Sequence, residues 1–151
     1  TMKTLDNART GVGAQGVGVA QGAFEEAVKF ARKRIQFGQP VISFQAVQHM
    51  LADMATEIEA ARALVYSVAR YIDSGAKDVT KESAMAKVFA TDMAMRVTTN
   101  AVQVMGGSGY MREYPVEKMM RDAKILQIYE GTNQIQRNVI GLALIKEAAR
   151  K

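Results

Sequence analysis

The sequence predicts an all-α fold, an up-and-down bundle of four long helices and one short helix, in a single domain spanning residues 1–151. Three observations support this prediction. Apolar residues recur every three or four positions over long stretches, which is typical of helices. Only two prolines occur, and ten methionines belong to a composition suited to long helices. No segment shows the alternating pattern that would indicate a strand.

The longest apolar seam predicts a helix of about eight turns. Ser43 is its expected N-cap, and Gly75 marks its expected end. The seam consists of Phe44, Val47, Leu51, Met54, Ile58, Ala61, Val65, Val68 and Ile72.

Four further helical stretches are expected. The first helix is expected from Ala8 to Arg32. Another begins near Asp78–Thr80 and ends at Gly106-Gly107, where glycine favours a helix stop. A shorter helical stretch lies between Pro115 and Ile128. The last helix is expected from Thr132 to Ala149, with an apolar seam of Ile135, Val139, Leu142 and Ile145.

The composition restricts the chemistry. The chain has no cysteine and one histidine, so we expect no metal site and no thiol nucleophile. His49 lies outside the long seam, and no G-x-S-x-G turn supports a hydrolase triad. No apolar run reaches the ~18 residues of a membrane span. The net charge of +5 fits a phosphate-bearing partner or a segment whose longer parent carries the balancing acid. The start at Thr1 suggests such a segment.

The first helix contains the letters of a dinucleotide fingerprint. Residues 11–16 read G-V-G-A-Q-G, but this motif requires a hydrophobic strand immediately before it. The preceding residues, Thr4–Arg9, do not form such a strand pattern. We therefore interpret the glycines as small helical residues that allow a close approach between backbones.

Three segments carry candidate chemistry. Arg34–Pro40 is a loop with a cation and an aromatic residue that looks exposed. Gln103–Tyr110 contains more glycine than a helix end requires, and amides freed by glycine can approach a phosphate; a plain helix stop is the alternative. Glu130 lies beside Ile128, Tyr129 and a glycine. Apolar neighbours could raise its pKa and make it a general base, or it could simply favour the positive end of the next helix.

Together these segments resemble the C-terminal domain of the acyl-CoA dehydrogenase family, over nearly the whole chain. Arg34–Pro40 is similar to the family's R-x-x-F-G-x-x loop, Gln103–Gly107 to its Q-x-x-G-G segment, and Tyr129–Gln136 to its Y-E-G-T-x-x-I-Q signature. The resemblance implies FAD-dependent α,β-dehydrogenation of an acyl-CoA thioester to the trans-2-enoyl-CoA. It also implies an N-terminal helical domain and a middle β-domain outside this chain.

The resemblance assigns roles to matching residues. Glu130 would be the catalytic base, and Gly131 would lie against the thioester. Ala8 stands where relatives acting on branched or long chains keep their base, which favours Glu130 and a short or medium straight-chain substrate. Other expected acyl-CoA contacts are Asp6, Asn7, Ala8 and Arg9. Expected FAD contacts are Thr132, Asn133 and Gln134 within one subunit, and Arg34, Gln45, Gln103, Val104, Met105, Gly106 and Gly107 toward the FAD of a neighbouring subunit.

The resemblance further implies a homodimer or homotetramer, and electron transfer to an electron-transferring flavoprotein. The expected location is the cytoplasm of a bacterium, or the mitochondrial matrix in a eukaryote. The segment alone should be inactive and bind FAD poorly. The alternative is a non-catalytic assembly domain of an acyl-CoA oxidase or of a DNA-binding relative. The intact Tyr129–Thr132 turn argues against DNA binding, so no nucleic-acid partner is expected.

Overall fold

A computed structural model describes residues 2–150, with side chains described over 8–150. Its five α-helices confirm the predicted all-α bundle. They are α1 (Met2–Lys33), α2 (Gln45–Asp73), α3 (Thr80–Met105), α4 (Val116–Leu126) and α5 (Asn133–Ala148). Shorter elements complete the connections: β1 (Ile35–Gln36), β2 (Gln39–Pro40), and the 3-10 helices η1 (Val41–Ser43) and η2 (Gly106–Tyr110).

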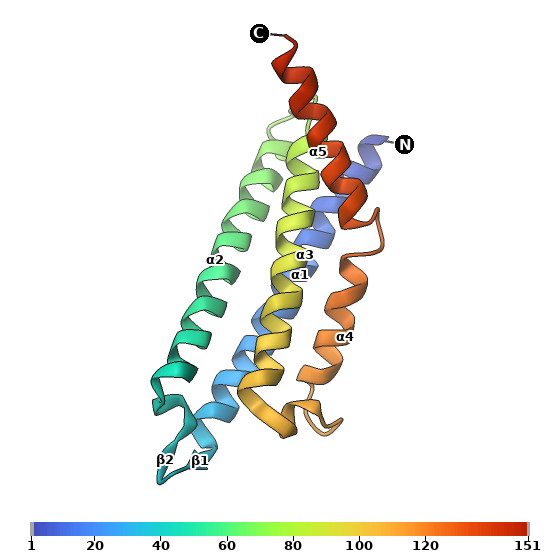
Figure 1. Cartoon of the computed structure of the whole chain (residues 1–151). Coiled ribbons are helices and arrows are strands. Elements are labelled where there is room, and N and C mark those ends of the chain that lie inside the picture. Colours follow the sequence, from blue (N-terminus) through green and yellow to red (C-terminus); the bar gives the residue numbers. More distant parts are fainter. Residues whose placement is uncertain (1, 151) are drawn as a thin grey trace.

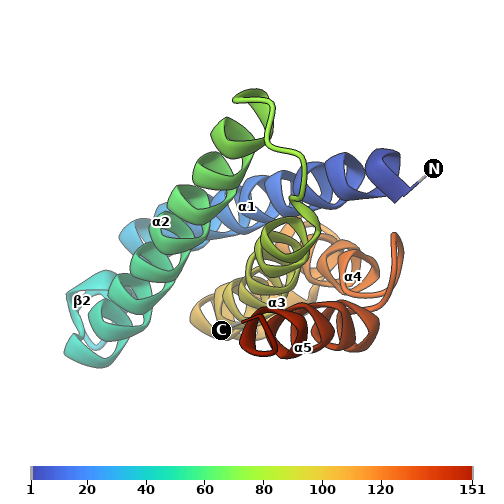
Figure 2. The ribbon, with the colours of Figure 1, turned by 90° about the horizontal axis from the view of Figure 1, so that it is seen from above.

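The first three helices alternate in direction, while α4 and α5 follow one another in the same direction along one side of the bundle (Figure 1). Seen from above, α3 lies in the middle of the group (Figure 2). It packs against each of the other four α-helices. This central position makes α3 the element from which side chains can reach every other helix.

The apolar seam of α2 explains its packing. All six of its central members are buried, from Leu51 to Val68. The core on α3 is wider than a single seam predicts, because this helix is covered on several sides. Its buried apolar residues are mainly small: Ala84, Ala86, Ala90, Met93, Ala94, Val97, Ala101 and Met105.

Glycines on α1 set the distance to α3. A Cβ atom on Gly13 would lie 3.2 Å from the carbonyl oxygen of Ala86, and one on Gly16 would lie 3.0 Å from that of Ala90. Both glycines lie inside the helix. This confirms that residues 11–16 allow a close contact between helices and do not form a strand-to-helix turn.

Two expectations about the α1–α2 connection are wrong. No strand is expected, yet the Arg34–Pro40 loop contains a short hairpin, with Ile35 paired to Pro40 and Gln36 to Gln39 in antiparallel register. Phe37 and Gly38 make its turn with φ angles of +50° and +79°, the left-handed conformation that tight hairpin turns require. Ser43 is not the N-cap of α2, because it ends η1 and Phe44 takes the cap position.

The seam of α5 is also not buried within the described chain. Ile135, Leu142 and Ile145 are 51%, 60% and 67% exposed. The buried residues of α5 are instead the polar Asn133 and Gln136 at its start. The helix thus uses its first turn to build a polar contact with α3.

Candidate functional site

The turn between α4 and α5 has an unusual backbone. Glu130 and Gly131 have φ angles of +53° and +88°. Glycine adopts this left-handed region freely, whereas for other residues it costs about 1–2 kcal/mol. Thr132 then caps α5, its hydroxyl accepting a hydrogen bond from the Ile135 amide at 3.3 Å. The strained residue of the turn is therefore Glu130, the residue that carries the carboxylate.

Two buried side chains hold the carbonyl groups of this turn. Lys87 of α3 donates from Nζ to the carbonyl oxygen of Gly131 at 2.9 Å. Gln136 of α5 donates from Nε2 to the carbonyl oxygens of Glu130 and Gly131, at 3.2 and 3.3 Å. Both side chains are 0% exposed. A Cβ atom on Gly131 would lie 2.4 Å from Gln136 Nε2, so a larger residue here would displace the Gln136 amide from the turn.

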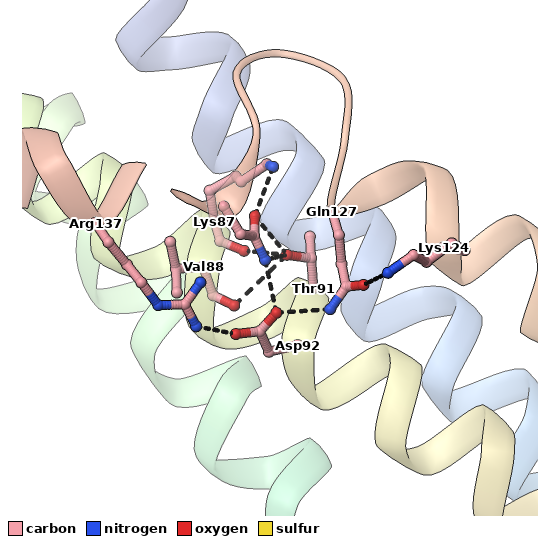
Figure 3. Close-up of polar contacts among 8 residues, drawn as sticks. Lys87, Val88, Thr91, Asp92, Lys124, Gln127 and Arg137 are labelled. Carbon is pink, nitrogen blue, oxygen red and sulfur yellow. Dashed lines mark hydrogen bonds and ion pairs between the residues drawn. The ribbon is translucent and has the colours of Figure 1, made fainter. Parts of the chain in front are cut away.

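Asn133 connects the turn to the middle of α3. Its Oδ1 accepts from Lys87 Nζ at 2.7 Å, and its Nδ2 donates to Thr91 Oγ1 at 2.9 Å and to Asp92 Oδ1 at 2.7 Å. Gln127 also donates to Asp92 Oδ1, at 2.7 Å. In Figure 3, Gln127 and Arg137 approach the Asp92 carboxylate from opposite sides.

The environment shifts three pKa values. Burial lowers the pKa of Lys87 to about 8, with the charge of Arg9 acting in the same direction and those of Asp92 and Glu130 opposing it. Burial raises the pKa of Asp92, but hydrogen bonds from Asn133, Arg137 and Gln127 outweigh it, so the net pKa is lowered. Burial raises the pKa of Tyr129, and the nearby charge of Glu130 adds to this effect. With a pKa near 8, Lys87 is mainly protonated at neutral pH.

The turn also contacts α1. The hydroxyl of Tyr129 donates a hydrogen bond to Oε1 of Gln15. Ala8 and Arg9, two of the predicted substrate contacts, lie half-buried earlier on the same helix. The charges of Arg9 and Glu130 both act on Lys87, so these groups share one neighbourhood. Asp6 and Asn7 lie on α1, but their side chains are outside the described residues.

Glu130 itself is exposed, as are its neighbours Ile128 (48%) and Tyr129 (38%). The expectation that these two residues exclude water from the carboxylate is therefore wrong for this chain alone. Both flank a turn at the surface, where their side chains are incompletely covered. Desolvation of Glu130 requires material beyond the described residues.

The remaining predicted cofactor contacts lie at the other end of the bundle. Arg34 and Gln45 flank the hairpin and η1, and both are exposed. Gln103–Gly107 ends α3 at the same end of the molecule (Figure 1). Lys87 and Met105 are about 27 Å apart along α3, at 1.5 Å per residue. The predicted site residues thus fall into two groups: Ala8, Arg9 and Glu130–Gln134 around the turn, and Arg34, Gln45 and Gln103–Gly107 at the other end of the bundle (Figure 1).

The glycines at and just after the end of α3 have different structural roles. Gly106 caps α3 with φ +60°. A Cβ atom on Gly109 would lie 2.8 Å from the carbonyl oxygen of Val102, so packing requires that glycine. Gly107 is exposed, has ordinary φ, and has open space around its Cβ position. The side chain of Met105 belongs to the core (3% exposed), so only its backbone remains for a ligand.

Sequence reasoning missed the residues beneath the turn. Lys87, Thr91, Asp92 and Gln136 were not predicted as site residues. One signal for Lys87 is present in the sequence: it is the only charged residue in Ser83–Ala90. Its spacing from Ala84 and Thr91, three and four residues, places it on their buried face. A charged residue on a buried face requires partners.

The described residues set two further limits. None of their helices is both long enough and apolar enough to cross a membrane. Within the same part of the chain, no three histidine, aspartate or glutamate side chains come together as a metal-binding group.

The fold and the site define a helical domain that exposes the Glu130 carboxylate on a turn whose backbone is hydrogen-bonded by the buried Lys87 and Gln136. The family profile for the acyl-CoA dehydrogenase C-terminal domain matches residues 1–145. The chain therefore belongs to this family, as its C-terminal domain. Acyl-CoA dehydrogenases are flavoproteins that use FAD.

Individual relatives agree with this assignment. Cyclohexane-1-carbonyl-CoA dehydrogenase of Geobacter metallireducens is 53% identical over 148 residues, covering 98% of this chain and 39% of the relative. CarC, a subunit of the caffeyl-CoA reductase-Etf complex of Acetobacterium woodii, is 50% identical over 146 residues, covering 97% and 38%. The structure of butyryl-CoA dehydrogenase from Megasphaera elsdenii superposes with a TM-score of 0.93 at 53% identity, covering 95% and 37%. The chain spans about two fifths of the length of these relatives.

Proposed function

We propose that this domain supplies the catalytic base, part of the FAD site and the oligomer interface of an acyl-CoA dehydrogenase whose other domains lie outside this chain. The reaction is α,β-dehydrogenation of an acyl-CoA thioester to the trans-2-enoyl-CoA. The observation that supports it most directly is the turn at Glu130, whose left-handed backbone is held by buried donors. Such strain persists where the surroundings over-determine a conformation, and it clusters at functional sites.

In this proposal the Glu130 carboxylate accepts the α-proton of the thioester. An exposed carboxylate is a weak base, so the rate depends on removal of water when substrate and the remaining domains cover the turn. Gly131 has no side chain to obstruct a thioester beside the carboxylate. FAD, when bound, would supply the acceptor for the β-hydrogen, which would leave the substrate as hydride. Arg9, whose charge acts on Lys87 as that of Glu130 does, contributes positive charge near the acyl-CoA, and Asp6, Asn7 and Ala8 precede it on the same helix.

The residues present fit FAD in two places. Near the turn, Gln134 is exposed and Thr132 is half-buried, whereas Asn133 is 2% exposed and committed to Lys87 and Asp92. We therefore assign Asn133 to the support of this site and leave direct contact to its neighbours. At the far end, the exposed cation of Arg34 suits a pyrophosphate. The open space at Gly107 lets backbone amides approach one. Gln45 and Gln103 add exposed amides at that end.

The separation of the two groups supports a shared site between subunits. One group faces the FAD of its own subunit, and the other, about 27 Å away along α3, faces the FAD of a neighbour. This arrangement implies a homodimer or homotetramer. The exposed apolar seam of α5 offers surface for assembly.

We further propose an electron-transferring flavoprotein as the partner that reoxidises the enzyme. The name of the A. woodii relative, which places it in an Etf complex, supports this partner. The bacterial sources of the relatives favour a bacterial cytoplasm. A short or medium straight-chain substrate is favoured by Ala8.

The test is Glu130→Gln in the full-length protein, which preserves shape but removes basicity. General-base catalysis contributes about 10²–10⁴-fold. The rate of flavin reduction by acyl-CoA should therefore fall by about 100-fold or more, while FAD content and folding persist. Asp53→Asn, an exposed carboxylate on α2, is the control and should leave the rate almost unchanged. A Glu130→Gln enzyme that reduces its flavin at a comparable rate would show that the base lies elsewhere.

A further inference from the structure

Lys87 is a fully buried cation on the central helix. Its side chain is 0% exposed on a helix whose other buried residues are mostly alanine, valine and methionine. A buried ammonium group is costly unless its hydrogen bonds are satisfied. Its ammonium group donates to the Gly131 carbonyl at 2.9 Å, in the turn after α4, and to Asn133 Oδ1 at 2.7 Å, in the first residue of α5. Both of these hydrogen bonds of Lys87 therefore hold the Gly131–Asn133 segment.

We propose that Lys87 is a positioning residue that holds the Glu130–Gly131 turn in its left-handed conformation and so fixes the place of the Glu130 carboxylate. The catalytic consequence rests on the function proposed above. The holding of the turn does not, because it follows from contacts within this chain.

The backbone conformation explains why such a support is required. Glu130 at φ +53° is strained, and released from its contacts it would relax toward the ordinary region of backbone conformations. Gln136 donates to the Glu130 and Gly131 carbonyl groups at 3.2 and 3.3 Å, and so shares the Gly131 carbonyl with Lys87, but it is a neutral donor. An ionised donor makes a hydrogen bond roughly twice as strong as a neutral one. The shorter, charged contact from Lys87 is therefore the main restraint.

The charges around Lys87 suit this role. Arg9 of α1, Asp92 of α3 and Glu130 of the turn all act on it. The positive charge of Lys87 lies beneath a turn that carries a carboxylate, while Asp92 is occupied by Gln127, Asn133 and Arg137. Asp92 therefore keeps Asn133 in place without competing directly for the Lys87 amino group.

The experiment compares Lys87→Met with Lys118→Met in the full-length protein. Methionine keeps the length of the side chain and removes its donors. Lys118 is an exposed lysine of α4 that pairs with Asp122, and it serves as the matched control. Three quantities are measured: amide hydrogen exchange of peptides covering residues 127–136, the rate of flavin reduction by acyl-CoA per bound flavin, and the affinity for acyl-CoA.

We expect Lys87→Met to speed exchange in 127–136 by about 10- to 100-fold, the factor equivalent to one lost charged hydrogen bond. Exchange in α2, which packs on α1 and α3, should stay unchanged. Flavin reduction should fall by roughly 100-fold, since small misplacements of a reacting group have effects of this size, with acyl-CoA affinity changed less than the rate. Lys118→Met should alter none of these quantities.

Unchanged exchange in 127–136 would overturn the proposal, as would a uniform increase along the whole bundle, which indicates general destabilisation. An unchanged rate despite a loosened turn would overturn its catalytic part. If Lys87→Met does not fold, Lys87→Gln, which keeps a shorter donor, gives the same comparison. Glu130→Gln is measured in parallel: if it keeps its rate, the proposed function fails, and the exchange data still decide whether Lys87 holds the turn.

Discussion

Asp92 of α3 forms an ion pair with Arg137 of α5, and this pair joins two helices that are adjacent in space but far apart in the chain. Arg137 is the fourth residue after the buried Asn133 on α5, one turn further along the helix, so both contact the same carboxylate. Gln127, at the end of α4, adds a third donor. One carboxylate therefore fixes the end of α4 and the start of α5 on α3.

Asp92→Asn should destabilise the domain by about 1–3 kcal/mol, because hydrogen bonds to an ionised group are lost. The pKa of Asp92 is lowered in the folded state, so the unfolded chain binds its proton at higher pH. The stabilisation is fully present above the unfolded pKa of about 3.9 and is lost as pH falls through the lower, folded pKa. Denaturant unfolding across an acid pH series should show the two proteins converging below about pH 4. A constant difference down to the acid limit would contradict this assignment.

Gly16→Ala should destabilise the bundle by about 1–3 kcal/mol, the usual effect of overpacking. The new methyl group would meet backbone atoms of α3, with the Ala90 carbonyl oxygen 3.0 Å and its carbon 3.2 Å away, and backbone cannot rotate aside as a side chain can. Gly18→Ala is the matched control, because nothing lies within 4 Å of its Cβ position. It should stabilise the helix by about 0.5–1 kcal/mol. Unfolding midpoints measure both effects, and equal effects from the two substitutions would refute the close α1–α3 contact.

Arg34→Met should weaken FAD binding by the full-length protein by about 10- to 100-fold, since a charged hydrogen bond contributes about 1.5–3 kcal/mol. Arg32→Met, two residues earlier and also exposed, is the control for loss of positive charge. FAD titration of the apoprotein distinguishes them. Equal losses in both variants would mean that general charge, and not a specific contact at Arg34, attracts the cofactor.

The sequence predicts the helices of this fold well, because their apolar periodicity reflects burial in one chain. The α2 seam from Leu51 to Val68 is buried as expected. The hairpin was missed because Phe37-Gly38 carries neither the Asn-Gly nor the Asp-Gly pair that indicates such turns. The α5 seam misleads for a different reason: periodicity reports an apolar face, and does not reveal whether the same chain covers it.

The sequence predicts the exposed residues of the turn but not the buried residues that support it. Local motifs identify Glu130 and its glycine, but a left-handed glutamate is not implied by any residue type. In our proposal the conformation of Glu130 depends on Lys87, 43 positions earlier in the chain. It also depends on Gln136, which the sequence pattern of α5 does not distinguish from an exposed polar residue. Such long-range restraints become visible only when α3 and α5 are placed side by side.

The closed set of contacts beneath Glu130 has an entropic consequence. Both carbonyl groups of the turn already have donors from within the chain, so its backbone freedom is lost when the domain folds and not when a ligand arrives. Fixing one residue in a single backbone well costs about 1–2 kcal/mol. The binding free energy of a ligand that contacts Glu130 and Gly131 is therefore not reduced by this ordering cost, because the turn is already ordered before the ligand binds.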